Sequence, residues 1–270
     1  MSAAEAGIRI RHLLAEERRQ GRRLWILGVA VGLVILASAY HAELLDGGRL
    51  AEGLPAIGVL LGEMVPPDFG NARDWVGPIL DTLAMSLAGT AVAVLLSLPL
   101  GILAARNTSP HPLVYRAARL FLNFFRAIPE LILGIVFVAA VGFGPLPGVL
   151  ALGLHSVGMV GKFFAEAVEH VDPRPVEAAH AAGASPFQVV QHAILPQVMP
   201  QFLDVMVYRW EYNFRASTVL GMVGAGGIGL ELMSALRLMQ YREVAAILLA
   251  ILAMVTVVDS TGSALRRRLK

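Results

Sequence analysis

The sequence predicts an all-α membrane protein, a polytopic bundle of about six transmembrane helices. Hydrophobic residues make up 56% of its 270 residues and charged residues only 16%, and the mean hydropathy of +0.66 is far from that of a soluble domain. At roughly 20 residues for each span, half a dozen spans use nearly the whole chain and leave no room for a separate soluble domain. The chain has no cysteine, which excludes a disulfide framework and a thiolate metal site.

The N-terminal part predicts a cytoplasmic amphipathic arm over residues 1–23 and a first span over residues 24–40. Arginines end the arm directly before the apolar run, so the N-terminus is expected inside. The segment Ala37-Ser-Ala39 resembles a signal-peptide cleavage site, but the apolar run is longer than a usual signal core, which favours an uncleaved span. Residues 41–75 are polar and rich in turns, and their short apolar piece at 54–61 is expected to lie along the membrane surface.

The remaining apolar runs complete a transmembrane domain over residues 24–270. Arginines in the segment 106–126 predict a cytoplasmic connection whose amphipathic end begins the third span, and Arg266–Lys270 predicts a cytoplasmic C-terminus. Counted from an inner N-terminus, the spans leave a polar loop over residues 169–199 on the cytoplasmic side. The expected spans after the first are 75–105, 129–142, 148–166, 202–223 and 244–259.

The loop 169–199 predicts two short helices joined by a glycine turn. Pro175 suits the first turn of a helix, and Gly183 suits the left-handed position that ends one. Ser185 with Gln188 three residues later forms a capping box, so a second helix starts at once. That helix is expected to run to about residue 194, where Pro196 stops it.

This loop resembles the EAA loop of ABC importer permeases, which forms the coupling helix that docks in a groove of the ATPase subunit. One position departs from the pattern, because Ala193 stands where the family usually has Ile, and Ile194 follows it. The alternative is an ordinary amphipathic surface loop. The residues that match are Glu177, Ala178, Ala179, Gly183, Leu195 and Pro196.

The chain also resembles the phosphonate-type ABC permeases over roughly residues 75–265. The segments that carry this second resemblance are Arg126-Ala-Ile-Pro-Glu130 and the run from Tyr208 to Gly229. It implies the type I ABC importer permease fold and a binding-protein-dependent importer made of a homodimer of this chain, two ABC ATPase subunits and an external solute-binding protein. It further implies alternating access and a substrate such as phosphonate, phosphite or phosphate. ATP and magnesium would bind the partner ATPase, and this chain would bind no cofactor and no nucleic acid and would not be an enzyme.

A polar stripe in the fifth span is the candidate translocation path. Tyr208, Glu211, Arg215 and Thr218 recur every three or four residues and share one helix face. Charges at this depth must face the bundle or a watery path. Glu211 and Arg215 therefore either line the path or form a structural ion pair. His155 in the fourth span is a further path candidate, because a polar side chain there is costly.

Other motifs are weaker. The run Gly224-Ala-Gly-Gly-Ile-Gly229 fits a dinucleotide fingerprint, but it follows a membrane helix and is expected to be a helix break with closely approaching backbone. Glu166, Glu169 and His170 resemble a metal site but are expected to form a solvated face. No Walker A pattern is present. The rival class is an ion-gradient-driven secondary transporter or channel, which would use Glu211, Asp81 or His155 and predicts internal repeats that the sequence does not show clearly.

Overall fold

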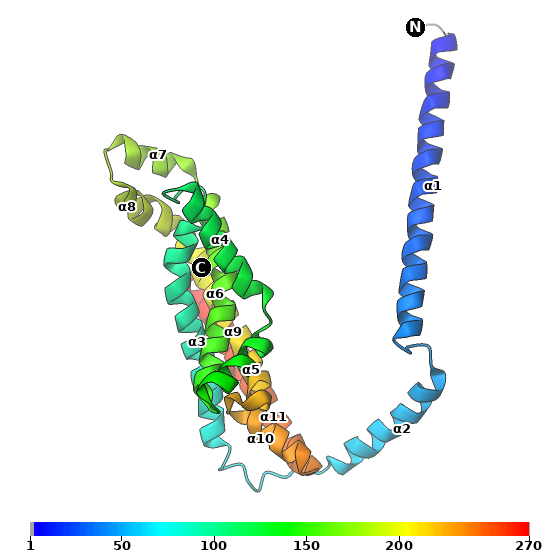
Figure 1. The fold of residues 1–270 in the computed structure, drawn as a ribbon, viewed down its shortest axis with the longest axis vertical. Coiled ribbons are helices and arrows are strands. Elements are labelled where there is room, and N and C mark those ends of the chain that lie inside the picture. The colour runs from blue at the N-terminus through cyan, green and yellow to red at the C-terminus, as the bar shows by residue number, and fades with distance from the viewer. Residues whose placement is uncertain (1–2, 270) are drawn as a thin grey trace. The chain divides into compact units, whose positions relative to one another are not determined.

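The computed structural model describes the backbone of residues 3–269 and the side chains of residues 19–49 and 51–268. Every regular element in this range is a helix (Figure 1). The chain divides into two compact units, residues 1–62 and 63–270. The second unit contains the loop over residues 169–199, which we call the docking loop after its expected role, and the polar stripe of the fifth span. It is the unit that positions the candidate site.

The first unit consists of α1 (Ala3–His41) and most of α2 (Gly47–Glu63). The segment Arg19–His41 is long and apolar enough to cross a membrane, and none of its residues is buried within the protein. The expected arm and the first span form one uninterrupted helix, because no proline lies near residue 23 and the single Gly21 is tolerated inside a helix. The apolar piece expected at 54–61 lies in α2, which contains Pro55.

The second unit is a helical bundle built around α3 (Val76–Leu103) and α6 (Pro145–Glu169), which pack extensively against each other. Small residues let α6 approach its neighbours closely. A Cβ atom at Gly158 would lie 2.6 Å from the backbone nitrogen of Arg126 and from the carbonyl oxygen of Leu122. Only glycine permits this contact, which holds the end of α4 (Pro112–Ala127) against the middle of α6.

The third span is not a straight helix. The helix α4 and the following α5 (Glu130–Val141) meet at an angle of 88°. They are long and apolar enough to span a membrane only when the two are taken together. Pro129 separates the two helices, and a residue before proline is disfavoured in the helical conformation. The amphipathic helix α4 leads into α5 across Ile128 and Pro129, and its end lies inside the bundle, because the backbone of Arg126 packs on Gly158. That this segment begins the third span stays a prediction.

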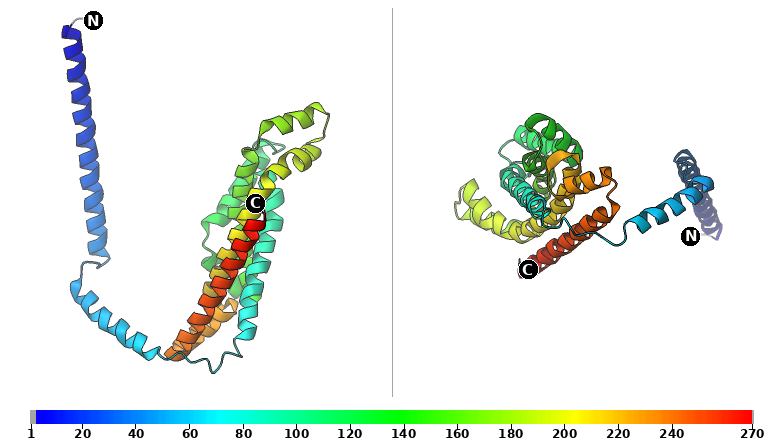
Figure 2. Two further views of the ribbon diagram at one scale, coloured as in Figure 1. Left: turned by 180° about the vertical axis from the view of Figure 1, so that it is seen from behind. Right: turned by 90° about the horizontal axis from the view of Figure 1, so that it is seen from below.

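The last part of the bundle contains α9 (Leu195–Leu220), α10 (Ile228–Arg237) and α11 (Tyr241–Leu269). The view from below in Figure 2 places α11 at the edge of this unit, where it packs on α9 and α10. A π-helical turn, η2 (Gly221–Ala225), ends α9, and Gly224, Gly226 and Gly227 all have positive φ. The glycine run is thus a helix break, as expected, and the described residues contain no strand that a dinucleotide fold requires.

Among the residues that the structure describes, four helices are long and apolar enough to span a membrane, and the count rises to six if each bent pair is one span. The second bent pair joins the stretch 186–225 to α10 at 57°. The prediction of an all-α polytopic bundle of about six spans is confirmed.

Candidate functional site

The docking loop begins with α7 (Pro173–Ala181), a helix of 9 residues with no buried residue. Asp172 caps it by accepting a hydrogen bond from the backbone N–H of Arg174. The Arg174 guanidinium also donates to this carboxylate and, together with the backbone bond, lowers the pKa of Asp172 below its ordinary range. The helix starts at Pro173 because Asp172 supplies the cap, and Pro175 lies in its first turn, as expected.

A glycine turn ends α7 as predicted. Gly183 has φ of +80°, and its N–H donates to the His180 carbonyl at 2.9 Å, while the Ala184 N–H donates to the Ala179 carbonyl at 3.1 Å. This pair of bonds is a Schellman motif, which requires a left-handed residue at the position of Gly183. The direction of the chain after α7 is set by this single backbone geometry.

The second helix of the loop, α8 (Pro186–Val189), starts at the predicted capping box. Gln188 N–H donates to the Ser185 hydroxyl, and Ser185 N–H donates to the Gln188 side chain at 2.8 Å. On this helix Phe187 is 75% exposed, an apolar side chain that the sequence analysis did not single out.

Pro196 does not stop the second helix, contrary to the prediction. The chain passes from α8 through a π-helical turn, η1 (Val190–Ile194), directly into α9, and Pro196 lies in the first turn of α9. A proline is tolerated there because its missing N–H is one that a helix start leaves unpaired, and the wider turn accommodates the ring. The loop is thus mechanically continuous with the fifth span.

The matched residues of the loop lie on its outer surface. Glu177, Ala178, Gly183 and Pro196 are exposed, and Ala179 and Leu195 are half-buried against the neighbouring core. The small alanine side chains of α7 leave its backbone accessible, which permits a partner surface to approach closely.

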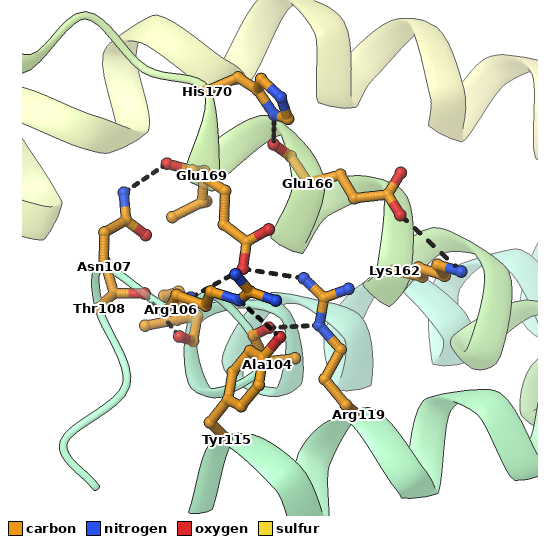
Figure 3. Close-up of polar contacts among 12 residues, drawn as sticks. Ala104, Arg106, Asn107, Thr108, Tyr115, Arg119, Lys162, Glu166, Glu169 and His170 are labelled. Atoms are coloured by element: carbon orange, nitrogen blue, oxygen red, sulfur yellow. Dashed lines mark hydrogen bonds and ion pairs between the residues drawn. The ribbon is translucent and has the colours of Figure 1, made fainter. Parts of the chain in front are cut away.

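A polar cluster fixes the base of the loop at the ends of α3, α4 and α6 (Figure 3). The Glu169 carboxylate accepts from the Arg106 backbone N–H at 2.9 Å and lies 2.9 Å from the Arg119 guanidinium. Arg119 donates to the Ala104 carbonyl at 2.8 Å, and Arg106 donates to the Tyr115 hydroxyl at 3.1 Å. Three helices thereby converge on one carboxylate, so the loop emerges from a fixed base.

The remaining members of the suspected metal cluster are engaged separately. Glu166 lies 3.9 Å from Lys162, and the His170 ring nitrogen lies 2.7 Å from the Glu166 carbonyl oxygen. Among the residues that the structure describes, no group of three acidic or histidine side chains is placed to hold a metal ion.

Glu211 and Arg215 do not form the ion pair that was one of the two alternatives for them. Glu211 accepts from Arg266 of α11, with nitrogen–oxygen distances of 2.8 and 3.0 Å. Arg215 pairs with Asp259 of α11 at 2.9 Å. Both side chains turn toward the adjacent helix because α11 packs along this face of α9. Thr218 on the same stripe is buried, and its hydroxyl has no hydrogen-bond partner among the described residues.

The opposite face of α9 carries a buried arginine that the sequence analysis missed. Arg209 is 1% exposed, and its Nε donates to the Ser156 hydroxyl at 2.8 Å. Ser156 donates to Asn213, which donates to Thr90 at 2.9 Å. The spacing of Arg209, Tyr212 and Asn213 at three and four residues was the available signal, because it defines a second polar face opposite to Glu211.

No carboxylate within the described part of the chain lies within 4.0 Å of the Arg209 guanidinium. Its Nη2 has no hydrogen-bond partner, and its Nη1 contacts only the Met159 sulfur at 3.3 Å. The Tyr212 ring lies 4.2 Å from the guanidinium carbon and provides a cation–π contact. A buried charge inside a span costs about 2.5–3.5 kcal/mol on insertion scales, so this arrangement needs a functional reason.

His155 and Glu130 border this arginine. The Glu130 carboxylate accepts from the Tyr212 hydroxyl at 2.7 Å and lies 3.4 Å from the His155 Nε2, whose other ring nitrogen contacts the Ile128 carbonyl oxygen. Of the predicted path residues, His155 lies on this side of α9. Tyr208, the residue before Arg209, is exposed, whereas Glu211 and Arg215 bond to α11.

The multi-span bundle, with its exposed loop of two short helices, has the fold of the ABC importer permeases. Residues 97–270 match the family described as "Binding-protein-dependent transport system inner membrane component", and the chain belongs to this family, as a permease of the phosphonate type. It is therefore a multi-pass membrane transport protein.

Relatives and solved structures agree with this assignment. The chain is 66% identical over 249 residues to the phosphite transport system permease protein PtxC of Stutzerimonas stutzeri, covering 92% of this chain and 90% of that protein. It is 44% identical over 218 residues to the phosphate-import permease protein PhnE of Mycolicibacterium smegmatis, covering 81% of this chain and 41% of PhnE. The structure of the MetNI methionine ABC transporter in inward-facing conformations contains a chain that shares the fold, with a TM-score of 0.63 at 22% identity, covering 73% of this chain and 96% of that chain.

Proposed function

We propose that this chain is the transmembrane subunit of an ATP-driven importer of phosphorus oxyanions, with phosphite as the first substrate to test and phosphonate and phosphate as related ones. The observation that carries the proposal is the docking loop, whose Schellman turn and capping box build the coupling helices in a chain 66% identical to a phosphite permease. A secondary transporter works without an ATPase subunit, so it does not need an exposed helix pair on which such a subunit docks.

The mechanism that the geometry supports is alternating access. Closure of the ATPase subunits would push on α7 and α8, and the continuous helix through η1 would deliver that displacement to α9. The ion pairs between α9 and α11 would make these two helices move together. ATP binding would thus favour one of two packings of the bundle, by as much as it stabilises that packing over the other.

The proposed assembly contains two copies of this chain, two ABC ATPase subunits and an external solute-binding protein. ATP and magnesium would be bound by the ATPase, and this chain would bind neither a cofactor nor nucleic acid. Both termini would be cytoplasmic, which the arginines before the first span and the run Arg266–Arg268 support. In the second unit, the C-terminal end of α11 and the docking loop both lie toward the upper end of the bundle in Figure 1, in agreement with this topology.

The test is reconstitution into proteoliposomes with the ATPase and the binding protein. We expect phosphite uptake that requires ATP on the side of the membrane that carries the ATPase. It should also require the binding protein on the opposite side. Phosphite uptake by the chain alone, driven by an ion gradient, would show that the ABC assignment of its transport is wrong. If the complex takes up an unrelated solute and no phosphorus oxyanion, the proposed substrate class is wrong, although the proposed coupling to the ATPase would stand.

A further inference from the structure

We propose that Arg209 is a transient binding site for the phosphorus oxyanion inside the bundle. This inference rests on the importer function proposed above and deepens it by naming the residue that takes the substrate's charge. The site consists of Arg209, Ser156, Met159 and Tyr212, and we refer to it as the Arg209 site.

The first argument is the state of the guanidinium. Arg209 is almost fully buried, yet its Nη2 has no partner and its Nη1 has only a thioether sulfur at 3.3 Å. Nη1 and Nη2 form the edge of the guanidinium that matches two oxygens of a phosphorus oxyanion. The Nε donor is already used by Ser156, so the free edge is held in a fixed orientation.

The second argument is that the nearby negative charge is engaged elsewhere. Glu130 is bonded to Tyr212 at 2.7 Å and lies 3.4 Å from His155, and it makes no direct contact with Arg209 in the part of the chain that the structure describes. Arg209 therefore has an acidic neighbour that balances its charge at a distance but leaves its Nη2 without a hydrogen-bond partner. A passing anion supplies what the edge lacks.

The third argument is access. Met159 and Tyr212 cover the guanidinium, and both are themselves partly exposed. Methionine is unbranched and flexible, so rotation of Met159 uncovers the edge without moving a helix.

The experiment uses the reconstituted complex and compares Arg209→Met with Arg267→Met, a matched change at an exposed arginine of the last turn of α11. We expect Arg209→Met to lower phosphite uptake about tenfold or more, because hydrogen bonds to a charged group are lost, and Arg267→Met to leave uptake unchanged. The thermal stability of the assembled complex should be equal or higher in Arg209→Met, since an apolar side chain replaces an unpaired buried charge. Normal uptake in Arg209→Met overturns the inference.

A second measurement does not depend on how that variant folds. The chain has no cysteine, so Met159→Cys places one thiol beside an intact Arg209. Phosphite should slow modification of this thiol by a maleimide severalfold in the absence of the binding protein, and it should not slow modification of Leu238→Cys, an exposed position at the C-terminal end of α10. Unchanged modification of Met159→Cys at saturating phosphite overturns the Arg209 site, even if the wild-type complex imports phosphite. A wild-type complex that imports no phosphorus oxyanion rejects the proposed function itself.

Discussion

The two faces of α9 hold charged residues in different ways. The face toward α11 pairs each charge, since Glu211 bonds to Arg266 and Arg215 bonds to Asp259. The face toward α6 buries Arg209 with a hydroxyl, a thioether and an aromatic ring as its contacts. The comparison teaches that charges within spans need not have one purpose: paired charges hold two helices together, and the unpaired one is available to a ligand.

The largest expected effect comes from the loop that would move α9. Gly183→Val forces a β-branched residue into a φ of +80°, at a cost of about 1–2 kcal/mol. No neighbouring atom lies within 4 Å of the added Cβ, so the change acts on the backbone alone and re-aims α8. We expect substrate-stimulated ATP hydrolysis and uptake to collapse while basal hydrolysis by the ATPase persists.

The control for this prediction is Gly183→Asn, because asparagine tolerates the left-handed conformation. It should retain most coupled uptake. Undiminished uptake in Gly183→Val would falsify the role of this turn in transmission, and the two faces of α9 would then need another source of motion.

The next test compares the ion pair between Glu211 and Arg266 with the pairing of Glu211 and Arg215 that the sequence suggested. We expect a double-mutant cycle of Glu211→Gln and Arg266→Gln to give a coupling energy of about 1–3 kcal/mol, measured as the free energy of unfolding of the complex. Removing one partner leaves the other charge without its counter-ion, and removing both relieves it. The cycle of Glu211→Gln with Arg215→Gln is the control and should give a value near zero. A larger value in the control cycle would contradict the helix pairing described above.

A smaller effect is expected for the second pair. Arg215 and Asp259 have side chains 45% and 44% exposed in the protomer, so their coupling should be below about 1 kcal/mol if water reaches them. The measurement is the same cycle with Arg215→Gln and Asp259→Asn. A coupling energy above that of the Glu211 pair would show that this exposed pair is covered in the assembly, and the ranking of the two pairs would reverse.

The smallest effect concerns the start of α7. The pKa of Asp172 is lowered by Arg174, so the cap stabilises α7 above the ordinary aspartate pKa of 3.8 and is lost only as the pH falls below it. Amide hydrogen exchange in α7 should therefore show no transition attributable to Asp172 between neutral pH and about pH 5. Asp172→Asn keeps the cap and should match wild type, whereas Asp172→Ala should exchange faster. Equal protection in all three proteins contradicts a capping role.

The sequence by itself determined the features that depend on neighbouring residues. The six apolar stretches, the Schellman glycine at Gly183 and the capping box at Ser185 and Gln188 follow from local composition and backbone preference. The glycine break after residue 220 was equally readable, because consecutive glycines cannot sustain a helix. These elements were predictable because each is stabilised within a few residues of chain.

Only the tertiary structure decided which charges meet. Glu211 and Arg215 have the spacing of a helical ion pair, but each finds a stronger partner on α11, 55 and 44 residues further along the chain. The spacing of Arg209, Tyr212 and Asn213 indicated a second polar face of α9, but only the packing of α6 on α9 showed that Arg209 is buried without a carboxylate partner. Pro196 likewise ends a helix by local rules and here begins one, because a π-turn precedes it. Helix formation is a short-range property of this chain, whereas the identity of each charge's partner depends on which helices lie side by side.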